Sequence, residues 1–258
     1  MKTYNLRIAW LYPSLMSTYG DRGNVICLQK RSQWRGIECE IVPIEKETPI
    51  ENLRECDVLF MGGAQDRQQE LVNKDLIITK GPVMKQMIER DIPALFVCAA
   101  YQFVGVYYKT ADGTKLPGLG ILDLYTEHQG DQRKRLTGNV TATISGAFDL
   151  YTKTKKWPII DLVGFENHGG RTYLGKNVLP LAHVTGGQGN NGEDMTEGAE
   201  YRNVIGSYFH GPLLPKNPHI ADWLLAKALE VKYKKKIILS QLDDELELQA
   251  HTAAQKYQ

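Results

Sequence analysis

Cys98 stands in the sequence where a nucleophile could act. It follows the short apolar run at residues 93–97 and precedes two small residues and a helix-compatible stretch, a pattern that predicts a buried strand, a sharp elbow and a helix. Such an elbow lifts a side chain out of the carboxyl edge of a sheet, beside the positive end of a helix, where a thiolate is favoured. The pattern therefore indicates a reactive thiol, and the alternative is a small buried hydrophobic residue.

A thiol also needs a base to take its proton, and an imidazole suits that task near neutral pH. Of the six histidines, His210 directly follows an expected buried strand, so we expect it at the same sheet edge as Cys98. His168 is the rival because its glycine-rich surroundings fit a tight loop near a site. A surface or structural role is the alternative for each.

Attack on a carboxamide or an ester requires two N–H groups that hold the oxyanion. Ala99, directly after the cysteine, offers one. The loop 62–64 offers the other, near Gly63, because glycines let the backbone turn its amides toward a ligand, although such loops also bind phosphate. An amino-acid substrate would bring a carboxylate, for which Arg135 and Arg171 are the candidate partners.

Strands and helices alternate in the first part of the chain. Strands are expected at 6–12, 37–44, 57–61 and 93–97, and helices from Asn24 to about 35, from 66 to about 79 and at 83–90. Asn24 is expected to cap the first helix and Gly36 to end it. This alternation predicts a parallel sheet with helices on both faces and ligands at the carboxyl ends of its strands.

Beyond residue 102 the expected strands are rich in β-branched residues and separated by Gly, Asn and Asp, which favours an antiparallel extension. They lie at 119–126, 135–144, 159–166 and 178–185. A last strand is expected at 201–209, directly before His210. A helix then begins with Asn217 as its cap and Pro218 at its first position. We expect one domain over 1–235 and a helical tail over 236–258 that is available to a partner.

The composition excludes several classes of function. With 31 basic and 30 acidic residues, the chain has no net field that would attract nucleic acid. The four cysteines show no metal-binding spacing and no disulfide framework, which fits a reducing cytoplasm and predicts no metal site. No apolar run approaches the roughly 20 residues of a transmembrane helix.

A set of motifs spread over residues 6 to about 230 is more specific than any single pattern. They lie at 11–13, 19–24, 62–67, 97–102, 118–123, 135–138, 164–172 and 208–217. Together they resemble the glutaminase subunit of bacterial lipid II isoglutaminyl synthases, the GatD type. That family is a cobyric-acid-synthase-like branch of the class I glutamine amidotransferases.

The resemblance implies a flavodoxin-like, three-layer α/β fold and a glutaminase. It implies Cys98 as the nucleophile, His210 as its general base and acid, and Arg135 as the residue that binds L-glutamine. Gln102, Glu166 and His168 are further candidate site residues. The implied partner is a Mur-ligase-like subunit, MurT, which uses ATP, with Mg²⁺ expected there, to amidate the α-carboxylate of D-isoglutamate in lipid II near the inner face of the membrane. No cofactor is expected in this chain.

The sequence departs from the family at the elbow and after the histidine. Ala99 and Ala100 stand where the family has glycines, and Ala64 replaces a related glycine. Alanine would cost about 1–2 kcal/mol wherever φ had to be positive, yet we predict retained activity because the oxyanion is held by backbone N–H groups.

Many class I glutaminases also have a glutamate two residues after the histidine, where this chain has Pro212. Either Cys98 and His210 act as a dyad or another residue, such as Glu166, orients the imidazole. Two other classes remain open, namely a different cysteine hydrolase on the same fold and a scaffold without activity.

Overall fold

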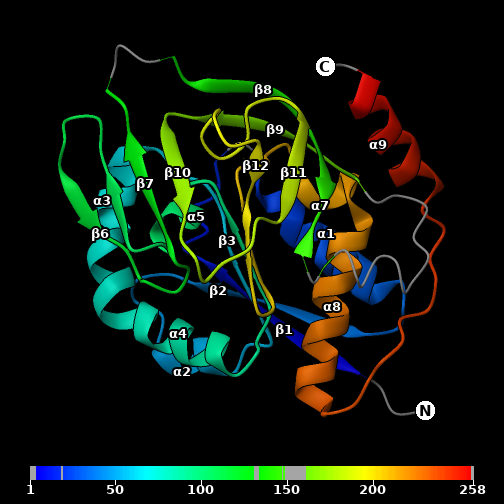
Figure 1. Cartoon of the computed structure of the whole chain (residues 1–258). Coiled ribbons are helices and arrows are strands. Elements are labelled where there is room, and N and C mark those ends of the chain that lie inside the picture. The colour runs from blue at the N-terminus through cyan, green and yellow to red at the C-terminus, as the bar shows by residue number, and fades with distance from the viewer. Residues whose placement is uncertain (1–3, 19, 131–133, 147, 149–160, 257–258) are drawn as a thin grey trace.

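A six-stranded sheet runs through the centre of the molecule in the order β13-β14-β4-β3-β1-β2 (Figure 1). The computed structural model describes residues 4–18, 20–130, 134–146, 148 and 161–256. The strands of this sheet are β1 (Asn5–Leu11), β2 (Glu38–Ile44), β3 (Val58–Met61), β4 (Ala94–Val97), β13 (Ala199–Tyr201) and β14 (Val204–Ser207). Only β13 pairs antiparallel, at one edge, so the mostly parallel sheet is confirmed.

Helices cover both faces of this sheet, with α1 and α8 on one side and α3 and α4 on the other (Figure 1). The helices are α1 (Arg22–Gln33), α2 (Ile50–Arg54), α3 (Asp66–Asp75), α4 (Gly81–Glu89), α5 (Ala99–Phe103), α7 (Leu213–Lys216), α8 (Pro218–Tyr233) and α9 (Glu245–Lys256). The three-layer architecture is therefore confirmed. Within the described ranges, no helix has both the length and the hydropathy that crossing a membrane requires.

Two of the expected helix boundaries are wrong. The first helix begins at Arg22, so Asn24 lies inside it, where its buried Oδ1 accepts the N–H of Leu214 at 2.9 Å instead of capping α1. The stretch from Asp66 onward is one continuous helical run, because a π-helix at Leu76–Lys80 joins α3 to α4. Pro82 lies at the start of α4, directly after the π-helix, so the helical hydrogen bond that its missing N–H forgoes falls where the hydrogen-bond pattern changes.

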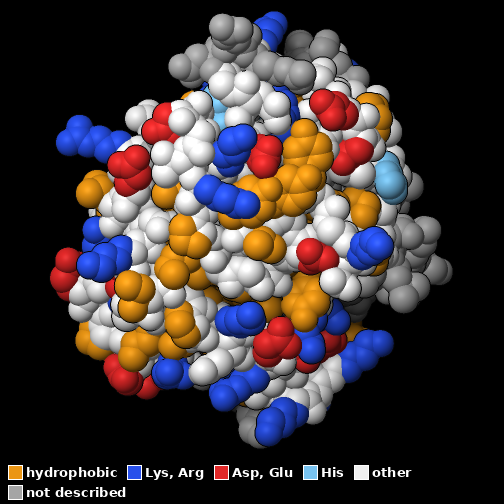
Figure 2. Space-filling view, turned by 60° about the vertical axis from the view of Figure 1, so that its left-hand side comes forward, with side chains coloured by type: hydrophobic (Ala, Val, Ile, Leu, Met, Phe, Trp, Pro, Cys, Tyr) orange, Lys and Arg blue, Asp and Glu red, His pale blue; other side chains and the backbone are white. Residues whose placement is uncertain are grey.

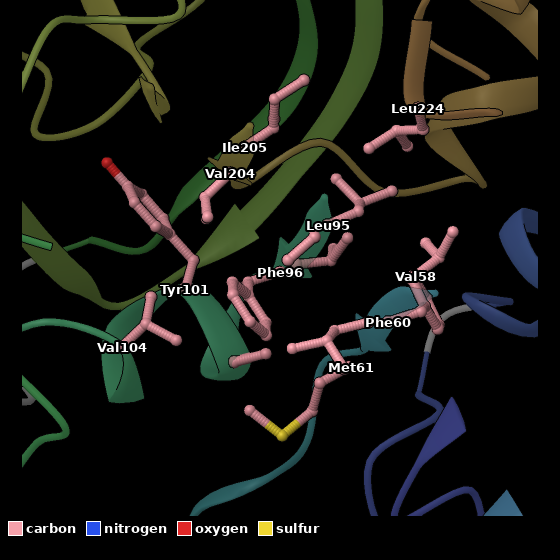
Figure 3. Close-up of a cluster of buried hydrophobic side chains, with 14 of the residues drawn as sticks. Val58, Phe60, Met61, Leu95, Phe96, Tyr101, Val104, Val204, Ile205 and Leu224 are labelled. Carbon is pink, nitrogen blue, oxygen red and sulfur yellow. The ribbon is translucent and has the colours of Figure 1, made fainter. Parts of the chain in front are cut away.

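Strand β4 is apolar throughout because both of its faces are buried. Leu95 and Phe96 point to opposite sides of the sheet, Leu95 toward Leu224 of α8 and Phe96 toward Tyr101 of α5 and Val104, the residue that follows α5 (Figure 3). All five side chains are fully buried. The end of β4 is thereby fixed from both sides, and that end carries Cys98.

Two four-stranded sheets form the antiparallel extension. One has the order β10-β7-β5-β6 and the other β12-β11-β8-β9. Their strands are β5 (Tyr107–Lys109), β6 (Lys115–Pro117), β7 (Leu124–His128), β8 (Leu136–Ile144), β9 (Asp161–His168), β10 (Gly170–Leu174), β11 (Ala182–Gly186) and β12 (Thr196–Glu197). All pairs are antiparallel except β5 with β7.

The sequence-based boundaries in this extension are only partly right. β5, β6, β10 and β12 were not anticipated. The strand expected from 119 begins only at Leu124, and the one expected from 178 begins only at Ala182. Leu119 and Ile121 instead donate backbone N–H groups to the end of α5, at Phe103 and Val104. The first two residues of the strand expected at 159–166 lie outside the described residues.

The sheet formed by β10, β7, β5 and β6 has two different faces. Its outer face carries a stack of tyrosines, in which the ring of Tyr125 lies 5.2 Å from that of Tyr107 and 5.3 Å from that of Tyr173. Figure 2 shows this side of the molecule, with several groups of hydrophobic side chains among charged ones. On the inner face, Thr126 and Thr172 are buried and hydrogen-bonded to each other at 2.7 Å.

The segment that follows α8 is fastened to the main body. Arg31, almost completely buried in α1, forms ion pairs with Asp222 and Asp244. Further on, His251 of α9 donates its Nδ1–H to the carbonyl oxygen of Lys216 at 2.8 Å. Because Lys216 ends α7, the helix that follows the loop of His210, α9 supports this part of the site from behind.

The core also contains a histidine that should make the fold sensitive to acid. His219 in α8 is fully buried against Phe148, and burial, assisted by His251 and Arg31, lowers its pKa to about 3. Below pH 6.5 this imidazole is protonated in the unfolded chain but stays neutral in the folded chain. The free energy of unfolding should therefore fall by about 1.4 kcal/mol per pH unit between pH 6.5 and 5 on account of this group.

Urea unfolding at pH 7 and pH 5 tests this expectation. His219→Leu should lose that part of the pH dependence, whereas His183→Leu, at an exposed position in β11, should keep it. An equal loss of stability with acid in the wild type and in His219→Leu would contradict the assignment.

Candidate active site

Cys98 forms the elbow that the sequence predicts between β4 and α5. Its backbone has φ 55° and ψ −109°, a conformation that costs a residue with a side chain about 1–3 kcal/mol. Hydrogen bonds hold it on both sides, since its N–H donates to Ser207 at 2.8 Å and its carbonyl accepts from Gln102 at 3.0 Å. The strain is thus concentrated at the residue that carries the thiol.

The three alanines that replace family glycines do not carry this strain. Ala99 and Ala100 belong to α5, and neither they nor Ala64 are among the residues with positive φ. The left-handed conformation belongs to Cys98 itself. Alanine therefore carries no backbone penalty at these positions.

The structure brings His210 to Cys98. His210 lies three residues after β14 and is tied to β9 by two backbone hydrogen bonds with Phe165, at 2.9 and 3.3 Å. A Cβ atom on Gly63 would lie 3.0 Å from Cε1 of His210 and 3.4 Å from Cβ of Cys98. The two side chains thus meet around Gly63, where only a glycine leaves room for the ring.

Asp21 is the functional residue that sequence reasoning missed. Its Oδ1 lies 3.2 Å from Nδ1 of His210, and its Oδ2 accepts the N–H of Gly63 at 2.6 Å. Asp21 comes from the loop after β1 and is completely buried. A signal was present, because an acidic residue after a strand of a parallel sheet is placed at the edge where ligands bind.

Asp21 takes the place for which Glu166 was suggested. Glu166 accepts the N–H groups of Gln188 and Gly189 at 2.9 and 2.8 Å, and one of its oxygens lies 3.9 Å from Nε2 of His168. Its carboxylate therefore holds the loop after β11, whereas the carboxylate of Asp21 orients the imidazole of His210.

The charges around His210 favour its protonated form. Burial opposes a charge on the ring, but the Cys98 thiolate and the Asp21 carboxylate outweigh that cost and raise the pKa of His210 to about 10. Burial also raises the thiol pKa of the other cysteines, to about 12 for Cys27 and Cys56 and about 11 for Cys39. Those three stay protonated at neutral pH, whereas Cys98 lies beside the ring of His210, which can take its proton.

A pocket of about 270 Å³ opens beside Cys98. Its described walls are Ala64, Gln65, Gln69, Cys98, Gln102, Tyr108, His128, Arg135, Asn167, His168, Gly169 and Gly170. These come from the loop after β3, from α3 and α5, and from the inner side of the extension. The pocket therefore joins the central sheet to the extension at the nucleophile.

Arg135 is the arginine that faces this pocket. It donates from Nε to Oδ1 of Asn167 at 3.1 Å and from Nη2 to the carbonyl of the same residue at 2.9 Å. Arg171 does not line the pocket and instead donates to the carbonyl oxygens of Gly169 and Lys134. Of the two candidates, only Arg135 is placed to bind a carboxylate beside Cys98.

Gln102 and His168 form part of the pocket wall. Nε2 of Gln102 donates to the hydroxyl of Tyr208 at 3.2 Å, and the ring of His168 stacks on that of Tyr208 with 3.5 Å between centroids. Burial lowers the pKa of His168, and its Nδ1–H donates to Gly170 at 2.7 Å. His168 is therefore a neutral wall residue, and the histidine beside the thiol is His210.

The expected oxyanion donors need one adjustment. The N–H of Ala99 is the first of α5 and lacks an acceptor within the helix. The N–H of Gly63 is occupied by Asp21, and so the N–H of Ala64, the next residue in the loop and part of the pocket wall, becomes the second candidate.

Comparison with known proteins shows the family of this chain. Residues 7–218 match the model of the CobB/CobQ-like glutamine amidotransferase domain. The chain belongs to this glutamine amidotransferase family. Within the family it is similar to the lipid II isoglutaminyl synthase subunit GatD of Staphylococcus aureus, with 43% identity over 96% of this chain and 93% of that protein.

A second GatD, from Streptococcus pneumoniae, is 37% identical over 93% of this chain and 87% of its own length. Solved structures support the fold alone. A structure described as a glutamine amidotransferase aligns with a TM-score of 0.57 at 16% identity, covering 85% of this chain and 98% of that one. The glutaminase domain of Trypanosoma brucei CTPS aligns with a TM-score of 0.57 at 14% identity, covering 92% and 97%.

Proposed function

We propose that this glutamine amidotransferase chain hydrolyses the side-chain amide of L-glutamine through a thioester on Cys98. The proposal rests on one observation: His210 contacts both Cys98 and Asp21, beside a pocket that contains Arg135. The pocket offers a guanidinium for the α-carboxylate and a nucleophile for the carboxamide. His210, whose pKa is raised, lies where it can hold the proton of the thiol and leave the nucleophile in its reactive form.

In the first half of the reaction, the Cys98 thiolate attacks the carboxamide carbon. The N–H groups of Ala99 and Ala64 stabilise the negative oxygen of the tetrahedral intermediate. The His210 imidazolium gives its proton to the departing nitrogen, the C–N bond breaks, and ammonia leaves a glutamyl thioester. Asp21 keeps the ring of His210 in the orientation that this transfer needs.

In the second half, His210 takes a proton from a water molecule that attacks the thioester carbon. The C–S bond breaks, glutamate leaves, and the imidazolium and the thiolate are restored. The cycle consumes one glutamine and one water and yields glutamate and ammonia, so every group of the chain returns to its starting state.

We further propose that the ammonia serves a Mur-ligase-like partner, MurT. In this proposal the partner uses ATP, with Mg²⁺, to activate the α-carboxylate of D-isoglutamate in lipid II at the inner face of the membrane, and this chain holds no cofactor. The support is the similarity to two GatD subunits over almost the whole chain. Their description as subunits of a synthase implies a second subunit.

An amidation assay with lipid II tests both parts of the proposal. The chain together with its partner, ATP and glutamine should convert lipid II to its amidated form, and ammonium chloride should replace both glutamine and this chain. Glutamine hydrolysis without any transfer to lipid II would leave a glutaminase with a different acceptor. No hydrolysis of glutamine by the complex would overturn the proposal itself.

The other class of cysteine hydrolase predicts a different chemical outcome. A diazo-ketone analogue of glutamine should alkylate Cys98 if the pocket binds glutamine, and excess L-glutamine should protect the thiol. Alkylation without protection would favour a hydrolase for another substrate. A scaffold without activity would not need the strained backbone of Cys98 or the buried carboxylate of Asp21 beside His210. Their presence favours an active enzyme over a scaffold.

A further inference from the structure

A completely buried carboxylate is bonded to the chain segment that leads to His210. It belongs to Glu197 of β12, a residue that takes no part in the reaction described above. Its Oε1 accepts the hydroxyl of Ser207 at 2.7 Å and the N–H of Tyr208 at 2.9 Å, whereas its Oε2 has no hydrogen-bond partner among the described residues. Burial raises the pKa of Glu197 to about 7. Such a group lowers the stability of the fold unless its hydrogen bonds offset the cost.

The backbone between β14 and His210 depends on this carboxylate for its hydrogen bonds. The chain leaves the central sheet after Ser207, so the next N–H groups no longer pair within that sheet, although they are buried and need acceptors. The N–H of Tyr208 donates to Glu197, and the N–H of Phe209 donates to Oγ of Ser207 at 3.0 Å. Because Glu197 also holds that hydroxyl, it fixes both residues that precede His210.

Ser207 connects the same carboxylate to the nucleophile. Its carbonyl oxygen accepts the N–H of Cys98 at 2.8 Å, one of the two hydrogen bonds that hold the strained elbow. Its hydroxyl is fixed in direction, since it donates to Glu197 and accepts from Phe209. Glu197 therefore acts through one serine on the segments that carry both reactive side chains.

The backbone around Glu197 is itself held in place. The chain turns at Gly198, which has φ +63°, and a Cβ atom there would lie 2.4 Å from the carbonyl oxygen of Gly206 in β14, so only glycine permits this close approach. The side chain of Asn190 bonds both backbone groups of Gly198, at 2.9 Å for the carbonyl oxygen and 3.0 Å for the N–H. The carboxylate of Glu197 is thus directed at the end of β14 by a turn that has little freedom to move.

We propose that Glu197 is a positioning residue, whose bonded oxygen keeps the segment 207–209, and through it Cys98 and His210, in the relative position that glutamine hydrolysis needs. The inference rests on the proposed glutaminase function and adds to it a residue outside the pocket wall. Both bonds go to one oxygen, so the role requires an acceptor at this point and not a negative charge. A displacement of about 1 Å between reacting groups can cost on the order of 100-fold in rate.

Glu197→Met and Glu197→Gln test this proposal in the complex with the partner. Methionine has no comparable acceptor, so kcat for glutamine should fall by about 10- to 100-fold, with less than about a threefold change in KM because the substrate contacts remain. Glutamine keeps one oxygen, and the N–H of Tyr208, which can only donate, selects the amide orientation that presents it. Glu197→Gln should therefore keep kcat within about threefold of the wild type. Equal losses in the two variants would overturn the proposal.

Glu200→Met is the matched control. Glu200 is a second buried glutamate, in β13, and its Oε2 accepts the N–H of Phe148 at 3.4 Å. The variant should keep the wild-type kcat. An equal fall of kcat in Glu200→Met and Glu197→Met would show that any buried carboxylate in this region has the same effect, and it would also overturn the proposal.

Ser207→Ala tests the same network without a change at Glu197. It removes the hydroxyl that holds Phe209 but leaves the carbonyl oxygen that accepts from Cys98, so kcat should fall by about 3- to 10-fold, the effect of one buried hydrogen bond. An unchanged kcat in Ser207→Ala would contradict the proposed role, whether or not Glu197→Met folds.

The reactivity of the thiol separates positioning from a purely structural role. Alkylation of Cys98 by iodoacetamide at pH 7 should slow in Glu197→Met and stay at the wild-type rate in Glu197→Gln, while amidation with ammonium chloride shows that each complex has assembled. A lower free energy of unfolding in Glu197→Met with unchanged kcat and alkylation would assign Glu197 to stability alone and overturn the inference. A failure of the glutaminase proposal is recognised separately, because the wild-type complex would then hydrolyse no glutamine.

Discussion

Cys98→Ala is expected to lower glutamine-dependent amidation by on the order of 10⁴-fold or more, because no other group in the pocket can form the thioester. Amidation with ammonium chloride should continue at the wild-type rate, since that reaction bypasses the thiol. A variant that has lost only the nucleophile amidates lipid II with ammonium chloride but not with glutamine, whereas a variant that disrupts the complex is impaired with both nitrogen sources. Residual glutamine turnover above about 1% would argue against a covalent mechanism.

Cys39→Ala is the matched control for this experiment. Cys39 of β2 is half-buried, and burial raises its thiol pKa to about 11, so it is uncharged at neutral pH. It is not among the residues that line the pocket. Its variant should retain full activity.

In the wild type at pH 7, iodoacetamide should modify Cys98 first, and peptide mass spectrometry reports that order directly. Faster modification of Cys39 would contradict the activation of Cys98 by His210.

Asp21→Asn is expected to lower kcat by about 10²- to 10³-fold, because the imidazole loses the anion that orients it and supports its charge. The asparagine cannot accept from both His210 and Gly63 with its single oxygen. KM for glutamine should change little, since Asp21 does not line the pocket. A large change in KM with unchanged kcat would instead place Asp21 in substrate binding.

The pH profile of the same variant gives an independent readout. In the wild type the pKa of His210 is raised to about 10, so activity should persist at high pH until the ring loses its proton. Removing the carboxylate of Asp21 lowers that pKa, and the alkaline limb should move to lower pH. Asp123→Asn, at a residue that accepts from Asn177 and lies outside the pocket wall, should keep the wild-type profile and rate.

Sequence patterns predicted the parts of the site that depend on one strand and its end. An apolar run followed by Cys98 and small residues predicts the elbow because strand, turn and helix each have a local signature. His210 was placed at the same edge by the same argument. The central sheet could be predicted for a similar reason, because its strands are short apolar runs between helices.

The residues that the sequence did not identify depend on contacts between distant segments. Asp21 becomes part of the site only because the loops after β1 and β14 meet at the same edge of the sheet, which brings Asp21 to His210, 189 positions further along the chain. The sequence suggested that Asn24 caps a helix, but its side-chain oxygen accepts the backbone N–H of Leu214. In the same way, the N–H of Gly63 looked available for a substrate until Asp21 occupied it.

Thermal stability and activity make opposite demands on the residue at position 98. Its backbone conformation is one that glycine adopts readily and other residues resist. A screen that selects only for heat resistance should therefore enrich Cys98→Gly, and every such clone would lack the thiol and with it the glutaminase activity. Libraries built for durability should leave this codon unchanged and count turnover alongside survival.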